Sequence, residues 1–437
     1  MNQSNVHLLD LPNEVLLIIL RKLNNIDVLY SLLDINNRRL DILAQDKIFT
    51  DVLNFVDIDN MSLIDRFCID ILPRIHDNIK SIILEPVLME RILLATVYPN
   101  LTELKLFNFK QQIVSKYFTD ESSLRSIFQQ RITNLILVNN DTHESISSLK
   151  DYTKNDKLPN LKCFSLKTYF QFQQYDQILS LLRRMSYLES LTLYICVKGH
   201  NRIIDGTCVQ NDILVYMPQL HSFSFYINTS IGTRDLSYNV SRENIQQTLV
   251  NSGQQNATSI ICNLTAYEVA CSIFSLPFAF DSLEDVGNIF PNIVFSYVTC
   301  LLVHDYDAFR HEFFVRIAQS FPLLKYLRIF NIESQLPVDP LTLSSDHSQS
   351  YTMVEYLHLT SLDVEYSHKD YLEQFLNETK AYVPYLNQLT VRYRHLKAVT
   401  NNFTRAETRR NCAKVNQLII NPPLDNSEEH SHYFPSL

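Results

Sequence analysis

The chain has 437 residues, 46% of them hydrophobic, and carries a formal net charge of −9. A chain of this length and apolar content can bury a large core and form two or three domains. It contains no long basic run, which argues against nucleic acid as the main ligand, because phosphate neutralisation needs clustered Lys and Arg. Its five glycines are too scattered to form a phosphate-binding loop, which argues against a nucleotide-binding enzyme.

Targeting and redox signals in the sequence point to the inside of the cell. The opening residues lack a basic start followed by an apolar run, so we expect no secretory signal. The longest apolar run, residues 269–280, is too short to span a bilayer and contains a proline. Eight cysteines are spread singly, with no Cys-x-x-Cys pair. We therefore expect a cytoplasmic and/or nuclear protein with reduced thiols, no membrane contact, no metal and no cofactor.

The first forty or so residues predict three short helices. We expect Asp10 to cap the first helix, with Pro12 in its first turn. A second helix follows, capped by Asp27, and residues 38–43 form a third. The apolar positions of the first two helices are Val15, Leu16, Ile19, Leu20 and Leu23, then Val28, Leu29, Leu32 and Leu33.

The first helix is apolar nearly all the way round, because Leu17 and Ile18 lie off its main apolar face. A helix of this kind must be buried by something. Three helices in about forty residues are also too small to fold alone. Two interpretations follow from physics: the segment caps the part of the chain that comes next, or it docks on another protein.

From residue 79 onward the chain repeats the frame apolar-x-x-apolar-x-apolar. It occurs in "YPNLTELKLF" at 98–107 and again in "FPLLKYLRIF" at 321–330. Successive frames lie about thirty residues apart, and the register between 231 and 300 stays open because the frames there are weak. The candidate frames begin at Ile79, Leu101, Ile132, Leu161, Leu188, Leu220, Ala257, Val298, Leu324, Val354, Leu386 and Val415.

Between frames the apolar period changes from two to about 3.6, which predicts helices within 171–188, 306–321 and 371–383. A strand and a helix repeated about every thirty residues resemble the leucine-rich-repeat family. The resemblance implies an α/β fold in which stacked units share one long core. Parallel strands would line the concave face of this solenoid and helices its convex face. We expect a helical domain at 8–50, a helical linker or N-terminal cap at 51–78, and about 12 irregular repeat units at 79–437.

The opening segment resembles an F-box. That family begins with Leu-Pro-x-Glu, continues with a Leu/Ile helix and an acidic-apolar-Leu step, and ends near an Arg. The family usually carries a Trp shortly after that Arg, whereas this chain has no Trp, and Leu40 and Phe49 stand near those places. The match covers residues 8–50. The matching positions are Leu11, Pro12, Glu14, Val15, Ile19, Leu20, Leu23, Asp27, Val28, Leu29, Ile35 and Arg38.

The resemblance implies the substrate-recognition subunit of a Skp–cullin–F-box ubiquitin ligase, which is not itself an enzyme. The F-box would dock a Skp-type adaptor protein and, through it, a cullin scaffold, while the repeats would bind an unknown protein substrate. Leu11, Pro12, Leu16 and Leu20 would be the central anchors of the adaptor contact. The adaptor-binding residues that it implies are Leu11, Pro12, Glu14, Val15, Leu16, Ile19, Leu20, Leu23, Val28, Leu29 and Leu32.

Two other classes of function stay open. The first is a leucine-rich-repeat scaffold that binds a protein without any link to a ubiquitin ligase. The second is a hydrolase within the insertions at 230–295, for which the scattered Ser, His and Asp residues define no catalytic triad. Capture by a Skp-type adaptor separates the ligase subunit from the scaffold, and turnover of a generic ester or phosphate would reveal the hydrolase.

Side chains that alternate with the apolar frame would point away from the core and could meet a substrate. Tyr and Arg are enriched at binding hot spots, and several frames carry them. The competing interpretation is an ordinary strand surface, because strands favour aromatic residues anyway. The candidate substrate-binding residues are Tyr194, Tyr226, Tyr326, Arg328, Phe330, Tyr356, His358 and Arg392.

Overall fold

The computed structural model describes residues 8–33, 35–108, 123–139, 158–172, 175–235, 241–335, 352–421 and 433–437. These residues form an α/β protein, as expected, with a mixed nine-stranded sheet, a parallel six-stranded sheet and a two-stranded sheet. The chain divides into two compact units. The N-terminal unit comprises Met1–Val197 and Gln210–Phe225, and the C-terminal unit comprises Lys198–Val209 and Tyr226–Leu437.

The N-terminal unit begins with four short helices, and side-chain caps set the starts of the last three. Asn24 accepts a hydrogen bond from the Ile26 amide and so begins the second helix, where Asp27 was expected to do this. The first helix begins after Pro12 with no side-chain cap, and Asp10 lies in the preceding 3-10 turn. The bounds are η1 Leu8–Asp10, α1 Asn13–Leu20, α2 Asn25–Leu32, α3 Arg38–Ala44 and α4 Lys47–Thr50.

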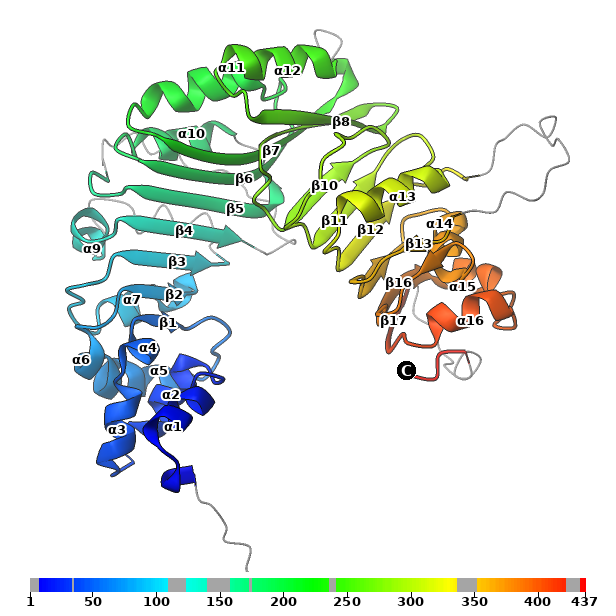
Figure 1. The fold of residues 1–437 in the computed structure, drawn as a ribbon. Coiled ribbons are helices and arrows are strands. Elements are labelled where there is room, and N and C mark those ends of the chain that lie inside the picture. Colours follow the sequence, from blue (N-terminus) through cyan, green and yellow to red (C-terminus); the bar gives the residue numbers. More distant parts are fainter. Residues whose placement is uncertain are drawn as a thin grey trace, which may run out of the picture. The chain divides into compact units, whose positions relative to one another are not determined.

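Six parallel strands follow, stacked side by side in chain order (Figure 1). The repeated frame sets their register, because its middle apolar residues lie opposite one another on neighbouring strands. These residues are Leu53, Ile82, Leu104, Leu135, Phe164 and Leu191, and all are buried. The strands are β1 Val52–Asn54, β2 Ser81–Leu84, β3 Glu103–Phe107, β4 Asn134–Asn139, β5 Cys163–Phe172 and β6 Ser190–Lys198.

The series of strands starts one unit earlier than the sequence predicted. β1 lies within 51–78, the segment expected to be a helical linker or cap, and its Leu53 pairs with Ile82 of β2. Its frame begins with Thr50, a polar residue, which hid it from a search for apolar first positions. Helices occupy residues 61–75 of this segment and parts of the described connections that follow. They are α5 Met61–Arg66, η2 Phe67–Ile71, α6 Leu72–Ile75, η3 Pro86–Leu88, α7 Met89–Leu93, α9 Arg125–Gln130 and α10 Tyr175–Arg183.

The nine-stranded sheet is mixed because its last strands run antiparallel. Its order is β1-β2-β3-β4-β5-β6-β7-β9-β8, and β9 pairs antiparallel with both β7 and β8. The Ala257 frame is therefore the first arm of a hairpin, not a unit of the parallel series. The strands are β7 Ser222–Gly232, β8 Ala257–Thr265 and β9 Glu268–Ser275. Short helices accompany them: α11 Gly206–Cys208, η4 Val209–Ile213, η5 Leu214–Tyr216, η6 Thr233–Asp235 and α12 Arg242–Asn251.

The C-terminal unit contains the six-stranded parallel sheet, in the order β10-β11-β12-β14-β16-β17. Apolar residues at matching positions lie opposite one another on its strands: Leu283, Leu301, Leu327, Leu362, Leu389 and Leu418. Leu283 lies on β10, which no frame predicted, because Asp285 stands where the frame requires its last apolar residue. The strands are β10 Ser282–Val286, β11 Cys300–His304, β12 Tyr326–Phe330, β14 Ser361–Asp363, β16 Gln388–Arg392 and β17 Gln417–Asn421. The helices are α13 His311–Ser320, α14 Lys369–Leu376, α15 Tyr393–Val399 and α16 Ala406–Cys412.

One frame of this sheet was placed five residues too early. The Val354 frame falls on β13 (Val354–Glu355), which pairs only with β15 (Ala381–Tyr382) in the two-stranded sheet. The strand that joins the six-stranded sheet is β14, whose frame begins at Leu359. Both frames read as apolar in sequence, but Leu357 is exposed whereas Leu362 is fully buried between β12 and β16. The neighbouring strands decide which of the two frames joins the sheet, and the sequence of one strand does not contain that information.

The predicted helices between frames are confirmed where the apolar period is clear. α10 buries Tyr175, Ile178, Leu179 and Leu182. α13 buries Phe313, Phe314 and Ile317, and the rings of Phe309 and Phe313 stack 4.1 Å apart. Each helix therefore uses one face to cover the apolar side of the strands beside it.

We expect the central frame residues to carry much of the stability of each sheet. Leu327→Ala removes a fully buried side chain at the centre of β12 and should lower the free energy of unfolding by about 3 kcal/mol. Leu323→Ala, four residues earlier, removes a side chain that is 42% exposed and should cost less than about 1 kcal/mol. Urea unfolding measures both, and equal losses would contradict the assigned register.

Candidate docking surfaces

Helix α1 is apolar on two opposite faces. Leu16 and Leu20 point into the protein, where Leu16 packs in a core cluster with Leu40 and Leu43. On the other side, Ile18 is 59% exposed, and Leu23, in the turn after the helix, is 52% exposed. Val15 and Ile19 are also exposed and share this face at helical spacing. An apolar stripe therefore stays open to solvent after the helix has contributed to the core.

The segment that precedes α1 is held in place by one arginine. The Arg39 guanidinium donates hydrogen bonds to the carbonyl of Leu9 (2.7 Å), the carbonyl of Leu11 and the side chain of Asn13 (2.7 Å). Asn37, which caps α3, fixes the backbone from which Arg39 extends. Arg39 thus ties the start of α1 to the start of α3 and sets the direction in which the exposed stripe points. The F-box pattern in the sequence points to the neighbouring Arg38 and gives no sign of this role for Arg39.

The structure divides the predicted adaptor-binding residues into two groups. Leu16, Leu20, Val28 and Leu29 are buried in the core of the chain, and Leu11 and Leu32 pack partly against it. These six residues therefore contribute to the core, and the four buried ones offer a partner little or nothing of their side chains. The exposed members of the set are Pro12, Glu14, Val15, Ile19 and Leu23. Ile18, which was placed off the main apolar face, is more exposed than Val15, Ile19 or Leu23.

In the C-terminal unit, four predicted substrate-binding residues lie on one six-stranded sheet. Tyr326, Arg328 and Phe330 alternate with the buried frame of β12, and Arg392 ends β16. The Arg328 Nε lies 3.3 Å from a carboxylate oxygen of Asp363 on β14, and the Tyr326 hydroxyl donates to the same oxygen. Strand alternation therefore brings these residues to the sheet face opposite the frame, as predicted.

Two further aromatic rings complete this face. The rings of His304 and Phe330 lie 4.5 Å apart, and those of Phe330 and Tyr366 stack at 5.6 Å with an interplanar angle of 22°. The guanidinium carbons of Arg328 and Arg392 lie 5.6 and 5.7 Å from the centre of the Tyr366 ring. Tyr366 was missed because the Val354 frame placed it well beyond its strand. With the correct frame at Leu359, it lies three residues after the end of β14.

The other four predicted substrate-binding residues lie elsewhere. Tyr194 and Tyr226 are fully buried, and Tyr356 is 3% exposed, with its hydroxyl donating to the carbonyl of Phe314 on the helix side of the sheet. His358 is exposed but precedes β14, outside the paired strands. Tyr356 and His358 were assigned to the sheet face through the wrong frame, so the sheet does not bring them to Arg328 and Phe330.

Tyr226 belongs to a buried polar network in the C-terminal unit. Its hydroxyl donates to the carbonyl of Glu284 and accepts a hydrogen bond from Asn228, whose amide also donates to Asp285 at 2.8 Å. Burial raises the pKa of Asp285 above its ordinary value, and the Asn228 hydrogen bond opposes this shift. Burial likewise lowers the pKa of His304, whose Nδ1 lies 3.9 Å from Asp285. The network holds the backbone at the start of the six-stranded sheet.

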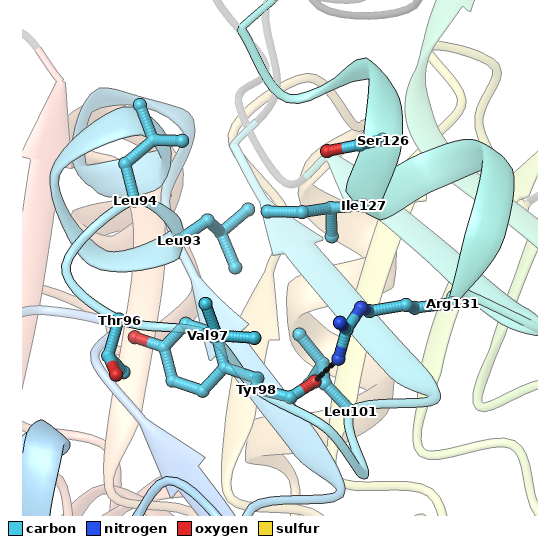
Figure 2. A pocket seen from close by; sticks show the side chains of 9 residues that line it. All are labelled: Leu93, Leu94, Thr96, Val97, Tyr98, Leu101, Ser126, Ile127 and Arg131. Carbon is cyan, nitrogen blue, oxygen red and sulfur yellow. Dashed lines mark hydrogen bonds between the residues drawn. The ribbon is translucent and has the colours of Figure 1, made fainter.

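A pocket of about 450 Å³ opens in the N-terminal unit between the end of α7 and α9 (Figure 2). Its wall is mostly apolar, and its one charged side chain, Arg131, donates to the carbonyl of Tyr98 at 2.5 Å. A single guanidinium beside hydroxyl groups provides no acid–base pair, so the lining supports no catalytic step. The lining residues are Leu93, Leu94, Thr96, Val97, Tyr98, Leu101, Ser126, Ile127 and Arg131.

Within the described ranges, no three His, Cys, Asp or Glu side chains are grouped so that they could hold a metal ion. Of the helices that the structure describes, none is long and apolar enough to cross a membrane. A scan against protein-family models and a search of curated proteins found no match for this chain.

We expect Asp285→Asn to stabilise the protein at neutral pH. Asparagine can still accept the Asn228 hydrogen bond and tolerates the positive φ of 54° at this position. A carboxyl whose pKa is raised by folding gives its full stability below its unfolded pKa of about 3.9, and that stability is lost as the pH rises through the folded pKa. The variant should therefore gain on the order of 1 kcal/mol at about pH 7.

Urea titrations of both proteins between about pH 4 and pH 7 measure this gain. The difference between them should shrink toward the acid end, because Asp285 becomes increasingly protonated in the unfolded state as well as in the folded state. His304 is present in both proteins, so its own titration largely cancels in the difference. A gain that is the same at every pH would show that the charge of Asp285 is not its cause.

Proposed function

We propose that this chain is the substrate-recognition subunit of a Skp–cullin–F-box ubiquitin ligase. In this proposal, helices α1 to α3 dock a Skp-type adaptor, and the strands that follow belong to a leucine-rich-repeat solenoid that binds a protein substrate. The chain contributes binding and no catalytic group, since its role is to raise the local concentration of the substrate near a ubiquitin-carrying enzyme. The cullin joins through the adaptor.

The exposed apolar stripe of α1 is the observation that carries the proposal. Val15, Ile18, Ile19 and Leu23 present apolar surface at a spacing suited to packing against the helices of another protein. The buried Leu16 and Leu20 hold this helix on the rest of the chain and so present the stripe in a fixed orientation. The revised anchors of the adaptor contact are therefore the exposed residues, and the buried leucines act as their support.

The strand registers support the repeat assignment. In two series of parallel strands, residues at the same frame position lie opposite one another on neighbouring strands. Helices such as α7, α10, α13 and α14 lie in connections between these strands. This is the arrangement by which repeats share one core. The antiparallel hairpin of β8 and β9 lies between the two series in the sequence, which accounts for the weak frames at 231–300.

The alternative is a protein-binding scaffold whose N-terminal helices serve only as a cap. One observation favours it: α2 and α4 pack on β1, and the Asn25 side chain donates to the carbonyl of Val52 at 3.0 Å. The helices therefore do cover the first strand. A cap and a docking module can share one set of helices, however, because the cap uses the buried side of α1 to α4 and leaves the exposed stripe free.

We expect Ile18→Asp and Leu23→Asp, singly and together, to abolish capture by a purified Skp-type adaptor. Each change places a charge on the apolar stripe, and loss of a central anchor weakens binding by roughly thirtyfold or more. Because both side chains are exposed, the free energy of unfolding should change by less than about 0.5 kcal/mol. Capture on immobilised adaptor and urea unfolding measure the two effects.

The matched control is Ile289→Asp, which makes the same change at a residue 70% exposed in the C-terminal unit. It should leave capture at the level of the unchanged protein. If the unchanged protein is not captured, the scaffold is the better assignment. If the α1 variants are captured as well as the control, the stripe is not the adaptor contact.

A further inference from the structure

One face of the six-stranded sheet in the C-terminal unit combines flat rings with arginines. We call His304, Phe330, Tyr366, Arg328 and Arg392 the aromatic–arginine surface. Its rings form a row, in which His304 contacts Phe330 and Phe330 stacks on Tyr366. Phe330 and Tyr366 remain 36% and 37% exposed, so an incoming group can cover both rings. Rings held in a row by a sheet lose little conformational freedom when a partner binds.

The two arginines of this surface differ in their charge balance. Arg328 is paired with Asp363, whose side chain is 12% exposed, so its charge is largely neutralised within the sheet. Among the described residues, Arg392 has no carboxylate within ion-pair distance, and it lies against the face of Tyr366. The exposed Arg394 follows two residues later at the start of α15. Arg392 and Arg394 therefore keep donors and charge available to a ligand.

The surrounding segment is basic in an acidic chain. Residues 391–414 contain seven Lys and Arg but one acidic residue, whereas the whole chain carries a net charge of −9. Burial and the positive charges of Arg394, Arg392, His368 and Lys369 lower the pKa of His395. Part of this charge is used internally, since Arg405 pairs with Glu373. What remains at Arg392, which lies over the Tyr366 ring, gives this part of the aromatic row a positive potential, and the exposed Arg394 follows it in the sequence.

We propose that the aromatic–arginine surface binds an acidic segment of a partner protein, with carboxylate or phosphate groups on Arg392 and Arg394 and an aromatic side chain on Phe330 and Tyr366. A guanidinium binds either anion through paired hydrogen bonds, and an exposed ring pair favours a third ring. The inference deepens the proposed function, because the segment would be the recognition signal of the ligase substrate. The binding itself requires no adaptor.

A protein segment fits this surface better than a nucleic acid. Single-stranded nucleic acid needs a positive groove that follows many phosphates along the strand. Here Asp363 neutralises one arginine, and Glu365, which directly precedes Tyr366 in the sequence and accepts a hydrogen bond from Asn421, adds a further carboxylate. Arg392 beside the row and Arg394 two residues further along the chain match one or two anionic groups. A short acidic segment supplies that number.

The test selects ligands for the full-length protein from a library of short random peptides. We expect the selected peptides to be rich in Asp and Glu and to contain an aromatic residue. Arg392→Glu should weaken a selected peptide by roughly tenfold or more, because it replaces an attractive charge by a repulsive one. Phe330→Ala should weaken it by roughly fivefold. Phosphorylated and unphosphorylated forms of one selected peptide then show whether phosphate or carboxylate is preferred, and tighter binding of either agrees with the proposal.

Arg410→Glu is the matched control, because it makes the same charge change at an exposed residue of α16 whose guanidinium lies over Tyr382. It should change the peptide affinity by less than about twofold, because salt screens the effect of a charge that does not contact the peptide. If Arg392→Glu does not fold, Arg392→Gln replaces it in the test, because it adds no repulsive charge. This variant should still bind the selected peptide more weakly than the unchanged protein. Melting curves identify any unfolded variant.

Three results would overturn the inference: no enriched peptide, enrichment of neutral or basic peptides, or acidic peptides that bind Arg392→Glu and Arg392→Gln as well as the unchanged protein. Tighter binding of a single-stranded RNA homopolymer, lost in Arg392→Glu, would assign the surface to nucleic acid instead. Failure here is distinct from failure of the ligase proposal. Arg392→Glu should leave adaptor capture unchanged, and Ile18→Asp should leave peptide binding unchanged.

Discussion

The rest of the structure depends on the lateral match between apolar residues on neighbouring parallel strands. A single frame such as Leu324, Leu327 and Ile329 cannot bury itself, and becomes core only when Leu301 and Leu362 lie beside Leu327. This constraint fixes which side chains face inward. By alternation it also fixes which residues reach the opposite face, and so the positions of Tyr326, Arg328 and Phe330 follow from the core.

The same constraint explains how much could be predicted from sequence. The period-two frames and the helical stripes between them are local patterns, so the α/β class, most strands and helices such as α10 and α13 were predicted correctly. Errors arose where the pattern was ambiguous within one segment. Leu357 and Leu362 are both leucines, and only the neighbouring strands decide that Leu362 is the core residue. β1 was missed because its frame starts with Thr50, which is buried despite its hydroxyl group.

The candidate site was predicted in part for a related reason. The sequence marks α1 as unusually apolar, but it does not say which side of the helix the chain uses for itself. Leu16 and Leu20 were expected to meet a partner and are buried, whereas Ile18 was set aside and is exposed. Likewise, Tyr226 and Arg328 both alternate with the apolar residues of their frames. Tyr226 is nevertheless buried, because β9 pairs with its strand and its hydroxyl donates to the Glu284 carbonyl, and no local pattern reveals these contacts. Long-range packing, which decides exposure, is the missing information in both cases.

The position of Arg39 has a consequence for how binding data on this protein should be read. Its three hydrogen bonds join the strip of chain before α1 to the start of α3, and none of them involves the exposed side chains of α1. In a mutational scan for partner contacts, a substitution of Arg39 would therefore register as a loss of binding even where a partner does not contact its side chain. Such a loss of binding would reflect displacement of the segment before α1 and not the loss of a contact with the partner. A structure of the variant alone would distinguish these two causes.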